Sequence, residues 1–247
     1  MTLTEFFHEN QKAAIAFSGG VDSAYLLYAA LQSGADVRAY YVKSAFQPQF
    51  ELDDARRLAE TLSADMRVLD VDILADETVA ANPSDRCYHC KRRIFSAIAS
   101  AAAADGYTLL LDGTNASDDA GDRPGMRALR ELSVRSPLRE CSLTKPEIRR
   151  LSREAGLFTW DKPAYACLAT RVPAGERLTA EKLENTERAE DFLFSLGFTD
   201  FRVRLFSGAA RLQLPAEQLP RLLERRAEIL SELKKTYSAV VLDLEVR

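Results

Sequence analysis

The chain of 247 residues is long enough to bury one large hydrophobic core or two modest ones, and its composition is ordinary for a globular protein. Its net charge of −4 argues against nucleic-acid binding through bulk charge, although a local basic face is compatible with it. The sequence has no apolar run long enough to span a bilayer, and its N-terminal segment lacks the apolar stretch of a secretory signal. We therefore expect a cytoplasmic protein whose four cysteines are metal ligands, nucleophiles or buried thiols.

Strand and helix patterns alternate through the first half of the chain. Apolar runs predict strands, and apolar residues at helical spacing predict the helices between them: strands at 13–17, 37–42, 66–73 and 107–112, helices at 24–31, 52–62 and 92–104. This alternation is typical of βαβ units and predicts an α/β fold, a parallel sheet with helices on both faces. Ligands bind at the carboxyl ends of such strands, so the loops after the first and last of them should open onto one cleft.

The second half of the chain has a different pattern. Residues 113–138 are polar and predict a long loop, and Thr144 with Glu147 predicts a capped helix start. A stretch with two prolines, Pro163 and Pro173, follows, and within it we place the boundary between a domain of residues 1–172 and one of residues 173–247. The last part predicts a small C-terminal α+β domain with a hairpin: helices at 179–196 and 220–235, strands at 201–206, 210–214 and 239–246.

Between the first predicted strand and helix lies a glycine-containing turn made of Ser18, Gly19, Gly20, Val21, Asp22 and Ser23. Glycines let the backbone approach a ligand closely, and the N–H groups at a helix N-terminus attract anions. This is not a Walker-type loop, because no lysine follows the glycines. The simpler alternative is a tight turn in which Ser23 or Asp22 caps the helix.

The hexapeptide SGGVDS resembles the S-G-G-x-D-S fingerprint of the PP-loop ATP pyrophosphatase family. The resemblance implies an adenine nucleotide alpha hydrolase-like fold and a loop that holds the pyrophosphate of ATP while the α-phosphorus is attacked. Mg²⁺ should offset the phosphate charge, with Asp22 as the first candidate to position it. Asp118 and Asp119 are a second pair of candidates, unless they belong to a solvated acidic loop. Further candidate nucleotide-binding residues are Asn115, Arg86 and Lys91.

Two of the cysteines, Cys87 and Cys90, form a C-x-x-C motif flanked by basic residues. Neighbouring cations favour the reactive or metal-binding thiolate. The motif is consistent with half a zinc site, a redox pair, or two thiols at a helix start. The chain has two histidines in all, so a four-ligand zinc site would need the distant Cys141 and Cys167.

Cys167 lies four residues before Arg171, which is close enough in sequence to stabilise a thiolate or an adjacent phosphate. A small buried thiol is the alternative. Arg202 and Arg204 are two residues apart in a predicted strand and therefore share one face. Such a pair suits bidentate binding of a phosphate or carboxylate, and an exposed strand face is equally consistent with it.

Four motifs, SGGVDS, NPSDRCYHCK, DGTNASDDAGDRPG and WDKPAYACLATR, resemble in this order the LarE group of PP-loop enzymes. The resemblance implies an ATP-dependent sulfur transferase of nickel-pincer cofactor synthesis, which adenylylates the carboxylates of pyridinium-3,5-biscarboxylic acid mononucleotide and converts them to thiocarboxylates. The cysteine at the position of Cys167 attacks the acyl-adenylate and displaces AMP. The resemblance to this group also implies a phosphate-binding role for Arg202 and Arg204, a metal- or phosphate-binding role for Glu190, and assembly into a homo-oligomer.

Two sulfur sources are compatible with this group. Cys167 gives up its own sulfur and becomes dehydroalanine, or Cys87, Cys90 and Cys167 hold a [4Fe–4S] cluster whose open iron carries a sulfide from a donor. Soft thiolates without histidine favour iron–sulfur over mixed zinc ligation. We predict the cluster version, and we expect Cys141 to be structural.

Three other functions are alternatives to this one. A PP-loop enzyme that thiolates tRNA needs a basic surface or an added domain, which the acidic charge disfavours. An amidating ligase of the NAD synthetase type would not use the cysteines. A nucleotide-binding module without catalysis leaves the cysteine set unexplained. We therefore expect a small-molecule partner, with neither membrane nor nucleic acid.

Overall fold

The computed structural model describes residues 1–118 and 124–245, and the chain forms two compact units. The second unit comprises Leu74–Ser84 and Pro163–Arg247, and the remainder of the chain forms the first unit. The units therefore divide after Lys162, ten positions before the predicted boundary, and the second unit also takes a segment from the middle of the first. In the part of the chain that is described, no helix is long and apolar enough to cross a membrane.

The described residues of the first unit include a parallel sheet with strand order β3-β2-β1-β4, as the alternating pattern predicted. Its strands are β1 (Lys12–Ala16), β2 (Asp36–Lys43), β3 (Met66–Asp70) and β4 (Leu110–Leu111). Ala14 of β1 pairs with Arg38 on one side and with Leu110 on the other. The apolar runs of β1 and β2 are buried, as expected for strands covered on both faces.

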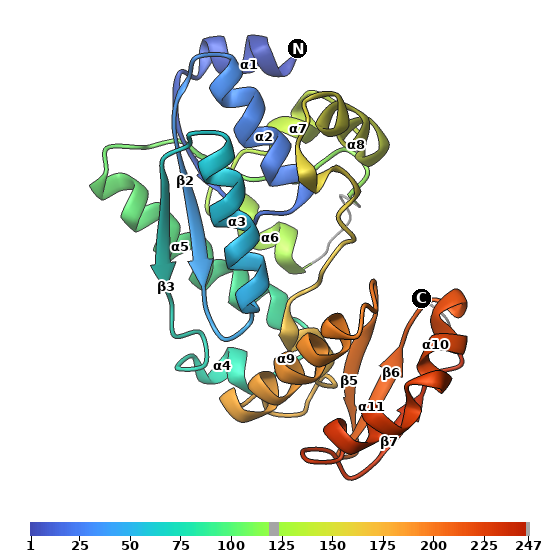
Figure 1. The fold of residues 1–247 in the computed structure, drawn as a ribbon. Helices are drawn as coiled ribbons and strands as arrows, with labels where there is room; N and C mark the ends of the chain where they lie inside the picture. The colour runs from blue at the N-terminus through green and yellow to red at the C-terminus, as the bar shows by residue number, and fades with distance from the viewer. Residues whose placement is uncertain (119–123, 246–247) are drawn as a thin grey trace. The chain divides into compact units, whose positions relative to one another are not determined.

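Helices cover both faces of this sheet (Figure 1). Ala13 and Ile15 of β1 belong to one apolar cluster, and Ala14 between them belongs to another, as period-2 alternation requires. The first cluster contains buried residues of α1 (Leu3–Glu9), α2 (Val21–Gln32), α3 (Gln49–Thr61), α7 (Pro137–Glu140) and α8 (Lys145–Glu154). The second contains those of α5 (Arg86–Ala104) and α6 (Pro124–Glu131).

Two predictions for the first unit need correction. The polar stretch 113–138 is not a continuous loop, because α6 lies within it and buries Ala128 and Leu129 beside α5. The arginines on the other face of α6 hide this narrow apolar stripe in the sequence. The helix predicted at 92–104 begins six residues earlier, at Arg86, so the C-x-x-C motif lies at a helix start.

The second unit has the predicted α-β-β-α-β order, and its core is separate from those of the sheet. Ser207 and Gly208 join β5 to the antiparallel β6 and have φ values of 48° and 80°, the left-handed pair that a two-residue type I′ hairpin needs. The predicted helix 220–235 is interrupted at Arg225 and forms two helices. The elements are α4 (Glu77–Ala80), η2 (Leu168–Arg171), α9 (Ala180–Ser195), β5 (Arg202–Phe206), β6 (Ala209–Gln213), η3 (Ala216–Gln218), α10 (Leu219–Glu224), α11 (Arg226–Leu233) and β7 (Val240–Leu242).

Asn82 explains why the segment 74–84 belongs to the second unit. Its side chain is fully buried, and Nδ2 donates to the carbonyl oxygens of Pro173 at 2.8 Å and Glu176 at 3.1 Å. Its own carbonyl accepts from the N–H of Gly175 at 2.8 Å. The φ of 56° is left-handed, a conformation that asparagine tolerates better than most residues.

We expect Asn82→Ala to lower the free energy of unfolding by about 1 to 3 kcal/mol, because the partly buried carbonyl groups of Pro173 and Glu176 lose their donor. Urea denaturation measures this change. The matched control is Glu77→Gln, which breaks an exposed ion pair with Arg177 in the same unit and should cost less than about 1 kcal/mol. Equal losses in the two variants would contradict the role given to Asn82.

Candidate active site

The SGGVDS turn connects β1 to α2 in the way that an anion site requires. Gly19 has φ of 72°, and a Cβ on it would lie 3.1 Å from the Cβ of Ala55 in α3, so both conformation and space call for glycine. The N-cap residue of α2 is Gly20, which has no side chain to bond the first N–H groups of the helix. These groups and the helix dipole therefore present a positive end at the turn.

The two serines of the turn have different roles. Ser23 is buried, and its Oγ donates to the carbonyl of Gly20 at 3.2 Å and lies 3.1 Å from the Oγ of Ser18. The same Oγ accepts from the N–H of Ser18 at 3.2 Å, so Ser23 holds the turn together from inside. Ser18 is exposed and presents its hydroxyl at the surface of the turn. Neither Ser23 nor Asp22 is the N-cap residue, so the simple capping alternative is wrong.

The turn after β4 lies directly against the SGGVDS turn, as the parallel sheet predicted. A Cβ on Gly113 would lie 2.9 Å from the backbone nitrogen of Ser23. The carboxylate of Asp112 is buried and accepts from the hydroxyls of Thr114 at 2.5 Å and Ser136 at 2.6 Å, which fixes this second turn. Residues about ninety positions apart in sequence thus form one surface.

Asp22, in the first turn of α2, pairs with a residue that the sequence analysis did not single out. The ammonium of Lys145 lies 2.5 Å from its Oδ2, and the amide of Asn115 lies 3.4 Å from its Oδ1. Burial raises the pKa of Asp22, and the bond from Lys145 opposes that rise. A lysine at the first position of a helix is unfavourable to the helix dipole, and this was the signal in the Thr-Lys-Pro-Glu motif.

One of the two other acidic candidates acts on Asp22. Burial is the main cause of the raised pKa of Asp22, and the charge of Asp118 adds to it. Asp118 itself accepts from the backbone N–H of Asn115 at 2.9 Å. Asp119 lies outside the described residues. Beside the glycine turn, the structure brings Asp22 together with Asn115 and Lys145.

Asp22→Asn should raise the free energy of unfolding at pH 7. Burial places the pKa of Asp22 above its ordinary value of 3.8, so the folded protein binds this proton more tightly than the unfolded chain. The free energy of unfolding then falls as pH rises through the interval between the two pKa values, and the penalty is complete at pH 7. The variant should be more stable than the parent at pH 7 and should lose that slope in urea titrations from pH 4 to 8. Lower stability with an unchanged slope would refute this.

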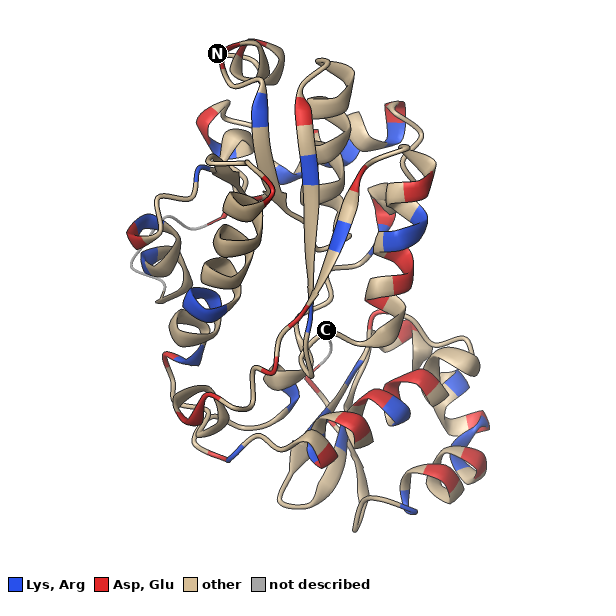
Figure 2. Cartoon of the chain, turned by 90° about the vertical axis from the view of Figure 1, so that its left-hand side faces the viewer, with Lys and Arg blue, Asp and Glu red and all other residues tan. Residues whose placement is uncertain are grey.

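The C-x-x-C motif lies at the N-terminal end of α5. Cys87 is exposed and Cys90 is half-buried, and positions three apart on a helix share one face. Basic residues lie along both α5 and α6 (blue in Figure 2). Arg86 is buried, and the Lys91 side chain lies over Gly125 of α6, where a Cβ would be 3.1 Å from its Cδ. Their predicted contacts with nucleotide phosphates stay predictions.

Cys167 belongs to the second unit, where it is half-buried and precedes η2. Arg202 donates to the carbonyl of Ala164 at 2.5 Å, and Arg204 donates to the carbonyl of Thr170 at 2.8 Å. The arginines predicted to bind a phosphate therefore contact the chain on either side of Cys167.

The carboxylate predicted to bind a metal or phosphate, Glu190, is engaged within the protein. It is buried and forms an ion pair of 2.7 Å with Arg171. Its metal role stays a prediction. Among residues 1–118 and 124–245, no three His, Cys, Asp or Glu side chains are gathered into a metal-binding group. Cys87 and Cys90 belong to the first unit and Cys167 to the second, so the units divide the three predicted cluster ligands.

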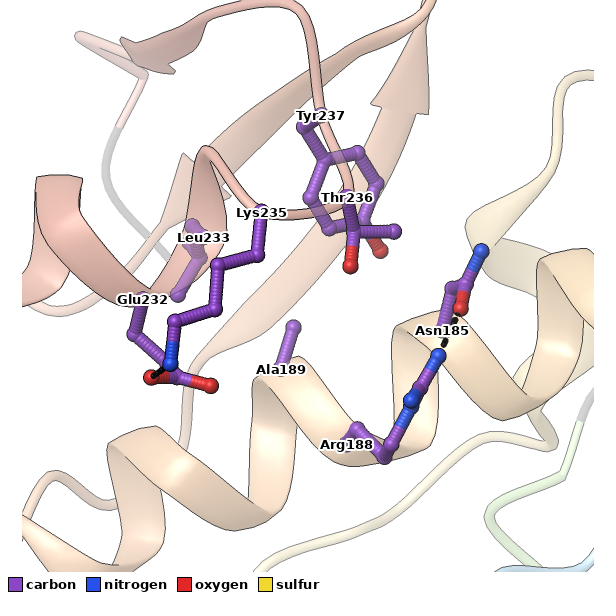
Figure 3. A pocket seen from close by; sticks show the side chains of 8 residues that line it. All are labelled: Asn185, Arg188, Ala189, Glu232, Leu233, Lys235, Thr236 and Tyr237. Atoms are coloured by element: carbon purple, nitrogen blue, oxygen red, sulfur yellow. Dashed lines mark hydrogen bonds and ion pairs between the residues drawn. The ribbon is translucent and has the colours of Figure 1, made fainter.

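Two other features lie outside the candidate site. Cys141 packs against the first apolar cluster, and burial raises the pKa of its thiol, which agrees with the structural role expected for it. A hollow of about 90 Å³ in the second unit contains none of the predicted site residues (Figure 3). Its charged side chains engage their neighbours, Lys235 with Glu232 and Arg188 with Asn185.

The glycine turn, the uncapped start of α2 and the parallel sheet behind them define a PP-loop α/β domain. The family model described as "Queuosine biosynthesis protein QueC" matches residues 12–93. Pyridinium-3,5-bisthiocarboxylic acid mononucleotide synthase of Lactiplantibacillus plantarum is 36% identical over 88% of this chain and 80% of its own. The chain therefore belongs to the family of this synthase, the LarE group, as its four motifs predicted.

Two further relatives have no assigned activity. Uncharacterized protein slr1717 of Synechocystis sp. is 39% identical over 98% of this chain and 92% of its own. Uncharacterized protein MJ0830 of Methanocaldococcus jannaschii is 27% identical over 96% of this chain and 91% of its own. Both relatives match nearly the whole chain, so the similarity extends through the second unit as well as the PP-loop domain.

Proposed function

We propose that the chain is an ATP-dependent sulfur transferase that converts the carboxylates of pyridinium-3,5-biscarboxylic acid mononucleotide into thiocarboxylates for nickel-pincer cofactor synthesis. The observation that carries the proposal is the uncapped α2 behind SGGVDS, in a chain 36% identical to the named synthase. That name supplies the substrate class, and the turn supplies a place for the leaving pyrophosphate.

In the first step, a substrate carboxylate oxygen attacks the α-phosphorus of ATP, and the phosphorus–oxygen bond to pyrophosphate breaks. The N–H groups of Gly20, Val21 and Asp22, with the Ser18 hydroxyl, hold the pyrophosphate as it leaves. Mg²⁺, when bound, supplies positive charge that offsets the phosphates. The residues fit such an ion, since the Asp22 carboxylate already attracts the ammonium of Lys145 at 2.5 Å. Asp22 would hold the ion, with Asn115 supporting it.

In the second step, the Cys167 thiolate attacks the activated acyl carbon. A carbon–sulfur bond forms, and the carbon–oxygen bond to AMP breaks, so that a thioester remains. Arg204 and Arg202 are the proposed ligands of the substrate phosphate, because guanidinium groups bind phosphate in a bidentate way. Both already donate to the segment that carries Cys167, so bound substrate and the nucleophile would share these two side chains.

Two versions of this second step differ in the role of Cys167. In the sacrificial version its thiolate displaces AMP as described. In the version that we propose further, Cys167 would hold a cluster with Cys87 and Cys90, and the cluster would supply the sulfide that replaces AMP on the acyl carbon. The donor set fits a [4Fe–4S] group in its chemistry, since Cys87, Cys90 and Cys167 are three soft thiols outside any disulfide. When bound, the cluster would supply a sulfide at the iron that has no protein ligand. A donor of that sulfide is then a required partner, and we propose cytoplasmic location and self-association as in the group.

Iron and acid-labile sulfide after anaerobic purification test this proposal. We expect about four of each per chain, and loss of both in Cys87→Ala. The matched control is Cys141→Ala, a thiol outside the set, which should keep the cluster. Iron-free protein that completes one turnover and then shows the mass loss of H₂S at Cys167 would replace the cluster with sacrificial chemistry.

Thiolation of tRNA is the remaining alternative. Acidic residues outnumber basic residues on α3 and on α9, so these two helices carry no extended basic track (Figure 2). Filter binding with tRNA across a salt series separates the two functions. Tight binding that weakens steeply with salt would favour the tRNA substrate.

A further inference from the structure

The chain around Cys167 is held by three guanidinium groups. We call residues 164–171 the Cys167 segment. Arg202 donates to its first carbonyl, on Ala164, at 2.5 Å, and Arg204 donates to that of Thr170 at 2.8 Å. Arg171, the last residue of the segment, donates to the carbonyl of Ala166 at 3.1 Å. The backbone is therefore fastened before and after the thiol.

One carboxylate anchors this arrangement. Oε1 of Glu190 accepts from the Nε of Arg171 at 2.7 Å and from the N–H of Val203 at 2.9 Å. Oε2 accepts from Nη2 of Arg171 at 3.1 Å and from the hydroxyl of Tyr165 at 2.5 Å. Glu190 thus joins both ends of the Cys167 segment to β5 and α9.

The charged groups of this anchor are buried, which limits the arrangements that they can adopt. The side chains of Arg171 and Glu190 are 0% and 2% exposed. The Arg171 guanidinium lies 4.7 Å from the ring centre of Tyr165, and that of Arg202 lies 5.1 Å from it. Burial and then the Glu190 charge raise the pKa of Tyr165, so its hydroxyl stays a donor. A buried charge pair tolerates few alternative arrangements of the chain that carries it.

We propose that Glu190 is a positioning residue for Cys167, which holds the Cys167 segment through Arg171 and Tyr165 and thereby sets the reactivity of the thiol. The inference rests on the proposed function only in placing Cys167 at the reacting centre. Glu190 also pairs with Arg171, the last residue of the Cys167 segment, so this ion pair keeps that end of the segment in place.

Alkylation of Cys167 by iodoacetamide, followed by peptide mass spectrometry on the full chain from pH 6 to 10, tests the proposal without ATP or substrate. In Glu190→Gln we expect the plateau rate at high pH to rise several-fold, because the segment is less constrained. Glu190→Asp keeps a carboxylate for Arg171 and should bring the plateau rate back toward that of the parent.

Two controls keep the result specific. Glu77→Gln breaks an exposed ion pair of the same unit, and Cys141 reports on the first unit in every sample. If Glu190→Gln does not fold by circular dichroism, Tyr165→Phe removes one of the four bonds and should also raise the plateau rate. A folded variant that alkylates Cys167 at the parent's plateau rate overturns the proposal. Because the assay involves no turnover, failure of sulfur transfer would be recognised separately.

Discussion

Cys167→Ser is expected to abolish thiocarboxylate formation, with the rate of product formation reduced by at least about 10³-fold. A serine hydroxyl without a strong base is a poor nucleophile at neutral pH, and it is a poor substitute for a soft thiolate as an iron ligand. ATP binding should be unchanged, since the nucleotide site proposed for the PP-loop belongs to the first unit and Cys167 to the second. The measurement is mass spectrometry of the product beside a calorimetric titration with ATP.

The matched control for this prediction is Cys141→Ser. Cys141 packs against the first apolar cluster, so its replacement should reduce stability slightly and leave sulfur transfer intact. Thiocarboxylate product from Cys167→Ser at the rate of the parent would remove Cys167 from the mechanism. It would then leave the C-x-x-C thiols as the remaining candidates.

Gly19→Ala should weaken ATP binding by at least about 100-fold, the second largest effect that we expect. The left-handed φ of 72° strains any side chain, and the new Cβ would lie 3.1 Å from that of Ala55. The turn relieves the conformational strain and the close contact by moving. This movement displaces the N–H groups proposed to hold pyrophosphate. A titration with ATP and Mg²⁺ measures the change, and the free energy of unfolding should fall by about 1 to 3 kcal/mol.

Gly156 provides a close control. Its φ is 70°, but nothing lies within 4 Å of the position its Cβ would take. Gly156→Ala therefore has the same conformational strain without the contact, and should lower stability by about 1 kcal/mol while ATP binding stays normal. Equal ATP affinity in the two variants would show that the conformation of the Gly19 turn does not govern nucleotide binding.

Much of the fold could be predicted because its signals are local. The apolar runs of β1 and β2 and the Ser207–Gly208 turn each act within a few residues, and the strands and the hairpin lie where these signals placed them. The helix α6 was missed because its apolar face is only a few residues wide. The break at Arg225 was missed for a related reason, since helical spacing continues through it.

The candidate site divides in the same way. SGGVDS is six consecutive residues, so its backbone chemistry can be recognised from the residue order alone. The pairing of Asp22 with Lys145 spans 123 positions, and no local pattern specifies it. Glu190 illustrates the same point, because a carboxylate among the other charges of α9 does not reveal that it is buried against Arg171.

By itself, the sequence determined the class of fold, the glycine turn between the first strand and helix of the sheet, and the family, because periodicity, glycine conformation and contiguous motifs are properties of neighbouring residues. Only the tertiary structure decided which charges meet. The energy of an ion pair or a buried hydrogen bond depends on distance and burial in space. It was therefore the packing that put Lys145 on Asp22, and that turned Arg202, Arg204 and Glu190 toward the segment carrying Cys167.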